Sequence, residues 1–308
     1  MSEAKQRRFT PGKKPARYGE NVFRIHENPK AGVPGGHLAA AFMGALARND
    51  FAQLVNAARE AKILWGDMPT KGSNLTIKQH TFQAQGIRRF CLGGVVDLYN
   101  KLENRNRRAG PKNKMFCAIR AWHQGAEDGY MKRIERSFQN LARDITEGRV
   151  TKINGQNKIV DEFYALWYAR SRLKYLPSLE VGVQGVDGAS YTIEEEEYLE
   201  RYGRFFTREG GRIPARQING LYIQMYKDDI FRRMTDTTDW KILTAQEGEF
   251  VVPDIPTVLA IPVTPTLCLF STATGDGMIT NDVVANLNRQ FKETSWEYFF
   301  ARDLGACP

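Results

Sequence analysis

The chain has 308 residues, of which 42% are hydrophobic and 11% aromatic, so it can bury a sizeable core in one large domain or two modest ones. No stretch reaches the ~18 apolar residues of a membrane span, and the basic segment 1–17 lacks an apolar signal core, so we expect a cytoplasmic protein that does not enter a membrane. The four cysteines form no C-x-x-C pair, which argues against a zinc ribbon or a redox motif.

The net charge of +9 is unevenly distributed along the chain. Residues 1–150 carry +14, whereas residues 151–308 carry −5. This asymmetry favours DNA or RNA as a partner of the N-terminal half, and it makes a basic protein a candidate partner of the acidic C-terminal half. The alternative is that the two halves attract each other, or that the basic face only keeps the protein in solution.

Three segments follow one another along the chain. Residues 1–35 are predicted to be a disordered basic arm, which is either a solvated tail or an arm that binds nucleic acid. Residues 36–75 are predicted to be a helical extension, because apolar residues recur at helical spacing from Leu38 to Leu46 and from Leu54 to Ile63. A break rich in glycine separates this extension from the main α+β domain, residues 76–308.

The main domain opens with a strand, a loop and a second strand between Ile77 and Tyr99, and Gly93-Gly94 suits a tight hairpin turn. The next segment, 101–114, has the densest positive charge of the chain. Its cations are candidate nucleic-acid ligands: Lys101, Arg105, Arg107, Arg108, Lys112 and Lys114. Tyr99 and Phe116 at its borders suit stacking on bases. The alternative is a solvated loop.

The clearest predicted helix runs from Glu127 to Glu147 and stops at Gly148. Its apolar residues step by three and four: Met131, Ile134, Phe138, Leu141 and Ile145. Four cations lie off this stripe: Lys132, Arg133, Arg136 and Arg143. A second helix is predicted over 159–175, a third begins with a capping box formed by Thr192 and Glu195, and a fourth opens at Pro214.

The C-terminal part alternates prolines with β-branched residues. Segment 250–270 therefore predicts short or edge strands, and 281–300 predicts a final helix. The fold class that follows is α+β, a mostly helical body with a small antiparallel sheet formed by segments 77–99 and 248–270. Such a sheet would bring His80 close to Asp254.

Four polar residues are candidates for chemistry. His80 begins a strand and suits a general base or a metal ligand, or it ties a turn to the core by hydrogen bonds. Asp254, framed by prolines at a strand end, suits a divalent-metal ligand, or it accepts backbone N–H bonds in a turn. Glu135 is expected to pair inward with an arginine, and Arg170 is a candidate partner of Glu135 or of a phosphate.

The same residues carry a resemblance to a known family. The motifs are His80-Thr81-Phe82-Gln83 with Arg88-Arg89-Phe90, Ile134-Glu135, Arg170-Ser171, Trp240-Lys241-Ile242-Leu243, Asp254-Ile255-Pro256 and Pro262-Val263-Thr264-Pro265. In order and spacing they resemble an uncharacterised bacterial domain-of-unknown-function family with a His-Tyr-Val-Pro-like opening and a late Asp-Asn-Pro motif. The chain departs from that pattern at Gln83, Ile255 and Trp167. The resemblance spans about residues 76–300 and supports the fold and the four candidate residues, but it implies no activity.

Two functions fit these observations. One is a nuclease-like enzyme of bacterial phage defence or of a mobile element, with His80 as base or ligand, Asp254 and Glu135 as ligands of a divalent metal, and Arg170 as a phosphate clamp. The alternative is a non-catalytic nucleic-acid-binding or regulatory protein that uses only the basic N-terminal half. The absence of a P-loop, H-E-x-x-H or G-x-S-x-G pattern excludes the enzyme classes that depend on those motifs.

Overall fold

The computed structural model describes residues 69–70, 72–174, 180–271 and 275–308, and the structural statements below concern these residues. The predicted basic arm 1–35 lies outside them, as does the predicted helical extension up to residue 68. The described end of that extension, residues 72–75, contains no helix.

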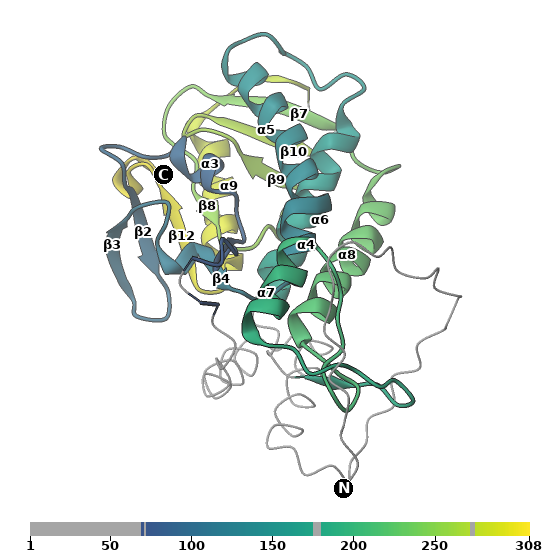
Figure 1. Ribbon diagram of the computed structural model, residues 1–308. Helices are drawn as coiled ribbons and strands as arrows, with labels where there is room; N and C mark the ends of the chain where they lie inside the picture. Colours follow the sequence, from purple (N-terminus) through teal and green to yellow (C-terminus); the bar gives the residue numbers. More distant parts are fainter. Residues whose placement is uncertain (1–68, 71, 175–179, 272–274) are drawn as a thin grey trace, which may run out of the picture. The chain divides into compact units, whose positions relative to one another are not determined.

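Helices contain more of the described residues than strands do (Figure 1). They are α3 (Ala84–Arg88), α4 (Gln124–Ala126), α5 (Lys132–Thr146), α6 (Asn157–Leu173), α7 (Ile193–Arg201), α8 (Ala215–Met234) and α9 (Asn281–Thr294). A π-helical turn, Glu127–Met131, leads directly into α5. Two 3₁₀ turns occupy Lys114–Phe116 and Leu304–Ala306.

The strands form several sheets rather than one. The first four-stranded sheet is antiparallel, in the order β3 (Arg105–Ala109), β2 (Val96–Asn100), β12 (Tyr298–Ala301), β8 (Val252–Pro253). The second has the order β11 (Gly277–Ile279), β7 (Trp240–Ala245), β10 (Leu267–Ser271), β9 (Ala260–Pro262), and β11 is parallel to β7. Two-stranded pairs join β1 (Lys78–His80) to β4 (Cys117–Ile119) and β5 (Val181–Gly182) to β6 (Arg212–Ile213).

The described part of the chain is therefore mixed α+β, and the predicted mostly helical body with one small antiparallel sheet is wrong. The expected hairpin within 77–99 is also wrong, because α3 separates β1 from β2 and each strand pairs elsewhere. Gly93 and Gly94 do form a tight turn with positive φ, but it lies between Leu92 and Val95.

Strand β12 explains why segments 77–99 and 248–270 do not pair with each other as predicted. The sequence predicted a helix as far as residue 300, but α9 ends at Thr294. Tyr298 and Phe300 are fully buried whereas Phe299 between them is only partly buried, which is the two-residue period of a strand. This strand inserts between β2 and β8, so these two strands share a sheet without pairing with each other.

Helix α5 forms as the apolar stripe predicted. Met131, Ile134, Phe138, Leu141 and Ile145 are all buried, and each such side chain contributes about 1.5–3 kcal/mol by leaving water. The ring of Phe138 stacks on Phe163 of α6, with 3.7 Å between centroids. Gly148, at φ +72°, follows the last turn as predicted.

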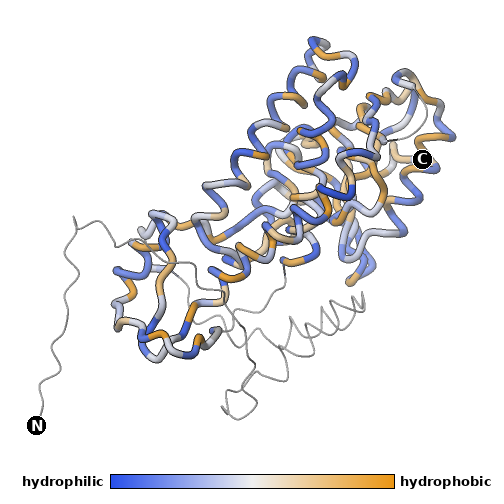
Figure 2. The backbone as a smooth tube through the Cα atoms, turned by 90° about the vertical axis from the view of Figure 1, so that its right-hand side faces the viewer, coloured by the Kyte–Doolittle hydropathy of each residue, from blue (hydrophilic) through white to orange (hydrophobic). Residues whose placement is uncertain are grey.

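Hydrophobic and hydrophilic residues alternate along the helices instead of forming long apolar runs (Figure 2). In agreement with this, none of the described helices combines the length and the apolarity that crossing a membrane requires.

Lys101 has a structural role that the sequence did not reveal. Its amine donates to the carbonyl oxygens of Lys292 at 2.9 Å, Glu293 at 3.2 Å and Ser295 at 2.5 Å. These carbonyls end α9, where backbone acceptors lack partners within the helix and a cation is favoured by the helix dipole. The predicted nucleic-acid ligand Lys101 is therefore occupied in holding α9 to β2.

Replacing Lys101 with Met should lower the free energy of unfolding by about 1–2 kcal/mol, because the apolar stem remains but the three carbonyls lose their donor. Urea unfolding followed by circular dichroism measures this. Lys112→Met is the matched control in the same segment, since Lys112 is exposed, and it should change stability by less than about 0.5 kcal/mol. Equal effects of the two substitutions would refute the capping role.

Candidate nucleic-acid interface

Arg170 of α6 is the centre of a buried polar cluster. Its side chain is 1% exposed and forms an ion pair with Glu135 of α5, while a second guanidinium nitrogen lies 3.4 Å from the Glu127 carboxylate. It also donates to the carbonyl of His80 at 3.3 Å and lies over the Trp122 ring at 5.4 Å. The expected inward pairing of Glu135 with an arginine is confirmed.

The cluster keeps its charges because both carboxylates lie beside the one buried cation. Burial alone would lower the pKa of Arg170, but the carboxylates of Glu135 and Glu127 raise it above its ordinary value, so the guanidinium stays protonated. The π-helical turn before α5 turns Glu127 toward this cation, and Glu127 also accepts a 2.6 Å hydrogen bond from the Trp122 indole.

His80 takes part in the cluster through its backbone and not through its ring. Its side chain is partly buried, and Nε2 donates to the carbonyl of Pro111 at 2.9 Å. This bond ties β1 to the loop before β4. It matches the alternative role foreseen for His80, a histidine that fixes a turn by hydrogen bonds.

Asp254 lies in a different buried cluster. Its carboxylate accepts the backbone N–H groups of Trp296 at 2.8 Å and Glu297 at 2.7 Å, and burial raises its pKa above the ordinary value despite those bonds and the nearby Lys174 amine. Lys174 forms a 2.7 Å ion pair with Glu297. The alternative foreseen for Asp254 is confirmed in that its carboxylate accepts backbone N–H bonds, but these come from a distant segment and not from a turn around Asp254 itself.

The structure thus joins His80, Glu135 and Arg170 through the Arg170 guanidinium, whereas the Asp254 carboxylate binds the backbone of Trp296 and Glu297. Over the described ranges, no hydrogen bond or ion pair joins the His80 ring to the Asp254 carboxylate. Nor do those residues hold a group of three or more His, Cys, Asp and Glu side chains arranged to bind a metal ion. The catalytic roles and the divalent metal stay predictions.

The other cations of segment 101–114 occupy strand β3 and the loop after it, rather than the solvated loop considered above. Arg105 pairs with Glu103 at 2.7 Å and Arg108 with Asp97 at 3.5 Å. Two guanidinium nitrogens of Arg107 are buried without a hydrogen-bond partner. Lys112 and Lys114 point into solvent. This segment therefore offers fewer available cations than its composition predicts.

A shallow groove lies between α3 and α5, with a volume of about 290 Å³. One wall comes from the outward side of α5: Lys132, Glu135, Arg136, Gln139, Asn140 and Arg143. Gln83 and Gln85 form the other wall at the start of α3. Gln139 donates to Gln83 and accepts from Arg89, so both walls are connected by hydrogen bonds.

The cations of this groove form a row along α5. At 100° per residue, Lys132, Arg136 and Arg143 fall within about 40° of one another around the helix axis. Lys132 pairs with the exposed Asp128 at 3.1 Å, and Arg143 pairs with the half-exposed Asp144 at 3.8 Å and donates to Asn140 at 3.4 Å. The described residues provide no ion pair or hydrogen bond to the side chain of Arg136, nor to that of its exposed neighbour Arg133. The one acid in the groove, Glu135, forms an ion pair with Arg170, which it shares with Glu127.

Periodicity placed these cations outside the apolar stripe, but it did not indicate the groove. Gln83, Gln85 and Gln139 were missed as lining residues because they reach the groove from separate elements. The signal that was available is the run of polar side chains at Lys132, Arg136, Asn140 and Arg143, which repeats every three or four residues opposite the stripe.

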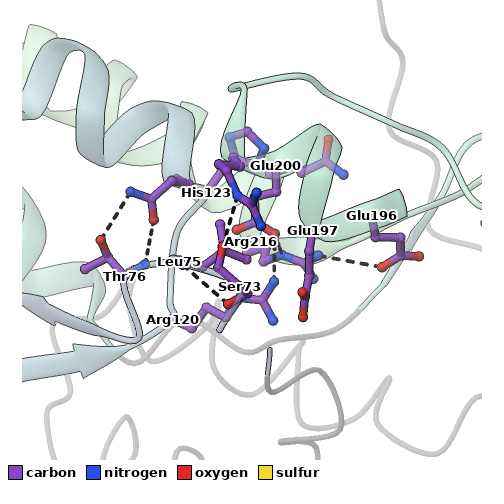
Figure 3. Close-up of polar contacts among 12 residues, drawn as sticks. Ser73, Leu75, Thr76, Arg120, His123, Glu196, Glu197, Glu200 and Arg216 are labelled. Atoms are coloured by element: carbon purple, nitrogen blue, oxygen red, sulfur yellow. Dashed lines mark hydrogen bonds and ion pairs between the residues drawn. The ribbon is translucent and has the colours of Figure 1, made fainter. Parts of the chain in front are cut away.

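A second cluster of buried charge joins α7 to α8 and to the chain entering the domain (Figure 3). The Glu200 carboxylate accepts from Arg120 at 2.8 Å and from Arg216 at 2.6 Å. Burial alone would raise the pKa of Glu200, but the two arginines hold it below its usual range. Glu197 of the same helix binds the backbone N–H and hydroxyl of Thr70. These carboxylates therefore hold the fold together.

His123 lies beside this cluster and caps α4. Its Nδ1 accepts the N–H of Gly125 at 3.0 Å, and its ring stacks on Phe205 with 5.1 Å between centroids. An accepting Nδ1 requires a neutral ring. Burial lowers the pKa of His123, which outweighs the opposing effect of Glu200.

Comparisons with known proteins add no identity to this geometry: no family model, no curated protein and no solved structure matches the chain. The resemblance to the bacterial domain-of-unknown-function family stays a prediction.

Replacing Arg170 with Met should lower the free energy of unfolding by about 3–5 kcal/mol, because Glu127 and Glu135 would lose their shared cation. Glu135→Gln should lower it less, and the double variant should lose less than the sum, with a coupling of about 0.5–3 kcal/mol. Arg136→Met, at the exposed position after Glu135 in α5, is the control. Its free energy of unfolding should stay within about 0.5 kcal/mol of the wild-type value. Additive losses in urea unfolding would contradict the pairing.

The stability of the protein should fall below about pH 6.5, the ordinary pKa of histidine, because the unfolded chain gains a proton at His123 that the folded chain resists. The stability that the neutral ring contributes is fully present above that pH. It is lost at up to about 1.4 kcal/mol per pH unit as the pH falls toward the lowered pKa of His123 in the folded chain. His123→Asn keeps a cap that does not titrate, so its unfolding midpoint should depend less on pH between about 7 and 5. An unchanged pH dependence would contradict this assignment.

Proposed function

We propose that this is a cytoplasmic, non-catalytic nucleic-acid-binding protein that contacts phosphates through the row of cations on α5. The observation that carries this proposal is the groove beside α5, in which Lys132, Arg136 and Arg143 follow one another and Glu135 is already paired with the buried Arg170. Cations in such a row release counterions from a polyanion, which is the main source of affinity for nucleic acid.

The helix that carries the row is also firmly packed against the rest of the domain. The opposite side of α5 is buried along its whole length, and Arg170 fixes the helix to α6 and β1. Because the helix is fixed before binding, its backbone loses little conformational entropy when it binds, and more of the attraction appears as affinity.

The nuclease alternative stays a prediction, and the geometry supports it less. A general base or a metal ligand needs a free imidazole or carboxylate facing substrate. The His80 ring is engaged by Pro111, and the Asp254 carboxylate is buried on two backbone N–H groups.

Segment 101–114 is a second, smaller contact surface in this proposal. Lys101 is occupied by α9, but Lys112 and Lys114 are exposed, and the ion pairs of Arg105 and Arg108 are as exposed as those of Lys132 and Arg143. These four exposed cations are therefore expected to contribute.

The double variant Lys132→Ala/Arg136→Ala tests the proposal. Each lost phosphate contact should weaken binding of nucleic acid and reduce the slope of log affinity against log salt by about 1. Fluorescence anisotropy with labelled oligonucleotides over a range of salt concentrations measures both quantities.

Arg232→Ala/Arg289→Ala is the matched control, because it removes two exposed arginines from α8 and α9. It should leave the salt slope within the experimental error of the wild-type chain. Wild-type binding that is absent or independent of salt would refute the proposed function, and equal losses in both double variants would refute the assignment to α5.

A further inference from the structure

The groove beside α5 contains no aromatic side chain on which a base could stack. All its lining side chains are polar or charged, and none is aromatic. Proteins that bind single strands obtain about 1–3 kcal/mol per base from stacking on aromatic side chains. The groove lacks that source of affinity.

The carboxamides of the groove offer little compensation. Gln139 is buried and already hydrogen-bonded to Gln83 and Arg89, so its amide is not available to pair with a base. Gln85 and Asn140 are exposed on either side. Two exposed amides and three cations can donate hydrogen bonds to phosphate and sugar oxygens. They are too few and too similar to read the donors and acceptors along the edge of an unpaired base.

The length of the row fits one strand of a duplex. Lys132 and Arg143 are eleven positions apart, or about 16 Å along the helix axis. One strand advances about 3.4 Å per nucleotide along the duplex axis while it winds around that axis, so a straight row of this length follows the strand over about three phosphates, one for each cation. Base pairing holds these phosphates at a fixed spacing, which suits cations that a packed helix also holds at a fixed spacing.

These observations point to one ligand class. We infer that the groove binds the sugar-phosphate backbone of one strand of a double-stranded nucleic acid, whose bases point away and are satisfied by the complementary strand. This inference rests on the proposed function and adds selection of duplex over single strand. DNA and RNA duplexes share the phosphate chemistry, and contacts to the 2′-hydroxyl distinguish them.

The test compares four labelled probes with the same number of phosphates: duplex DNA, duplex RNA, and the corresponding single strands. Affinities for the full chain are measured by anisotropy at one fixed salt concentration. At least one duplex should bind about tenfold more tightly than its single strand, a difference comparable to the loss of one stacked base. The better of the two duplexes identifies the source of the backbone.

Variants assign the preference to the groove. Arg136→Ala/Arg143→Ala should reduce duplex affinity about tenfold or more and reduce the preference for duplex. Arg136→Lys should retain most of the affinity, because lysine still contacts phosphate as a point charge. Arg232→Ala/Arg289→Ala should change neither quantity, and the urea midpoints of all variants establish that each is folded.

The outcomes separate the two claims. If no probe binds, the proposed function fails. If single strands bind as tightly as duplexes, or if the preference for duplex survives in Arg136→Ala/Arg143→Ala, the protein binds nucleic acid but the inference about the groove is overturned.

Discussion

The guanidinium of Arg170 is the constraint on which the described domain depends. One buried cation joins α6, the two carboxylates before and within α5, and the first strand of the main domain. A buried charge is tolerated only with partners in good geometry, so the rotation of α5 about its axis is fixed by this contact. The side of α5 that faces solvent, and hence the row of cations, is fixed with it.

The same helix combines two opposite surfaces. Its inward side is an unbroken apolar stripe from Met131 to Ile145, and its outward side carries four cations from Lys132 to Arg143. Mutual repulsion along that outward side destabilises the helix slightly, and burial of the stripe offsets it. Cations held near one another on a well-packed helix are available to a polyanion, because the repulsion is relieved on binding.

Local patterns predicted what depends on neighbours in sequence. The stripe of α5, its end at Gly148 and the capping box of Thr192 and Glu195 were all foreseen, since each is set within one or two helical turns. Contacts between segments that are distant in sequence were not foreseen. The amine of Lys101 caps a helix about 190 residues later, and β12 takes its identity from the strands on either side. Composition alone also overstated segment 101–114, because ion pairs and burial are not visible in a sequence.

Hydrogen–deuterium exchange of the full chain, with and without nucleic acid, tests whether the groove beside α5 is the binding surface. Bound nucleic acid should slow exchange in the segments that form the groove, 83–88 and 132–143, and leave α8 and α9 unchanged. Protection confined to segment 101–114 or to the surroundings of Asp254, with α5 unchanged, would contradict it.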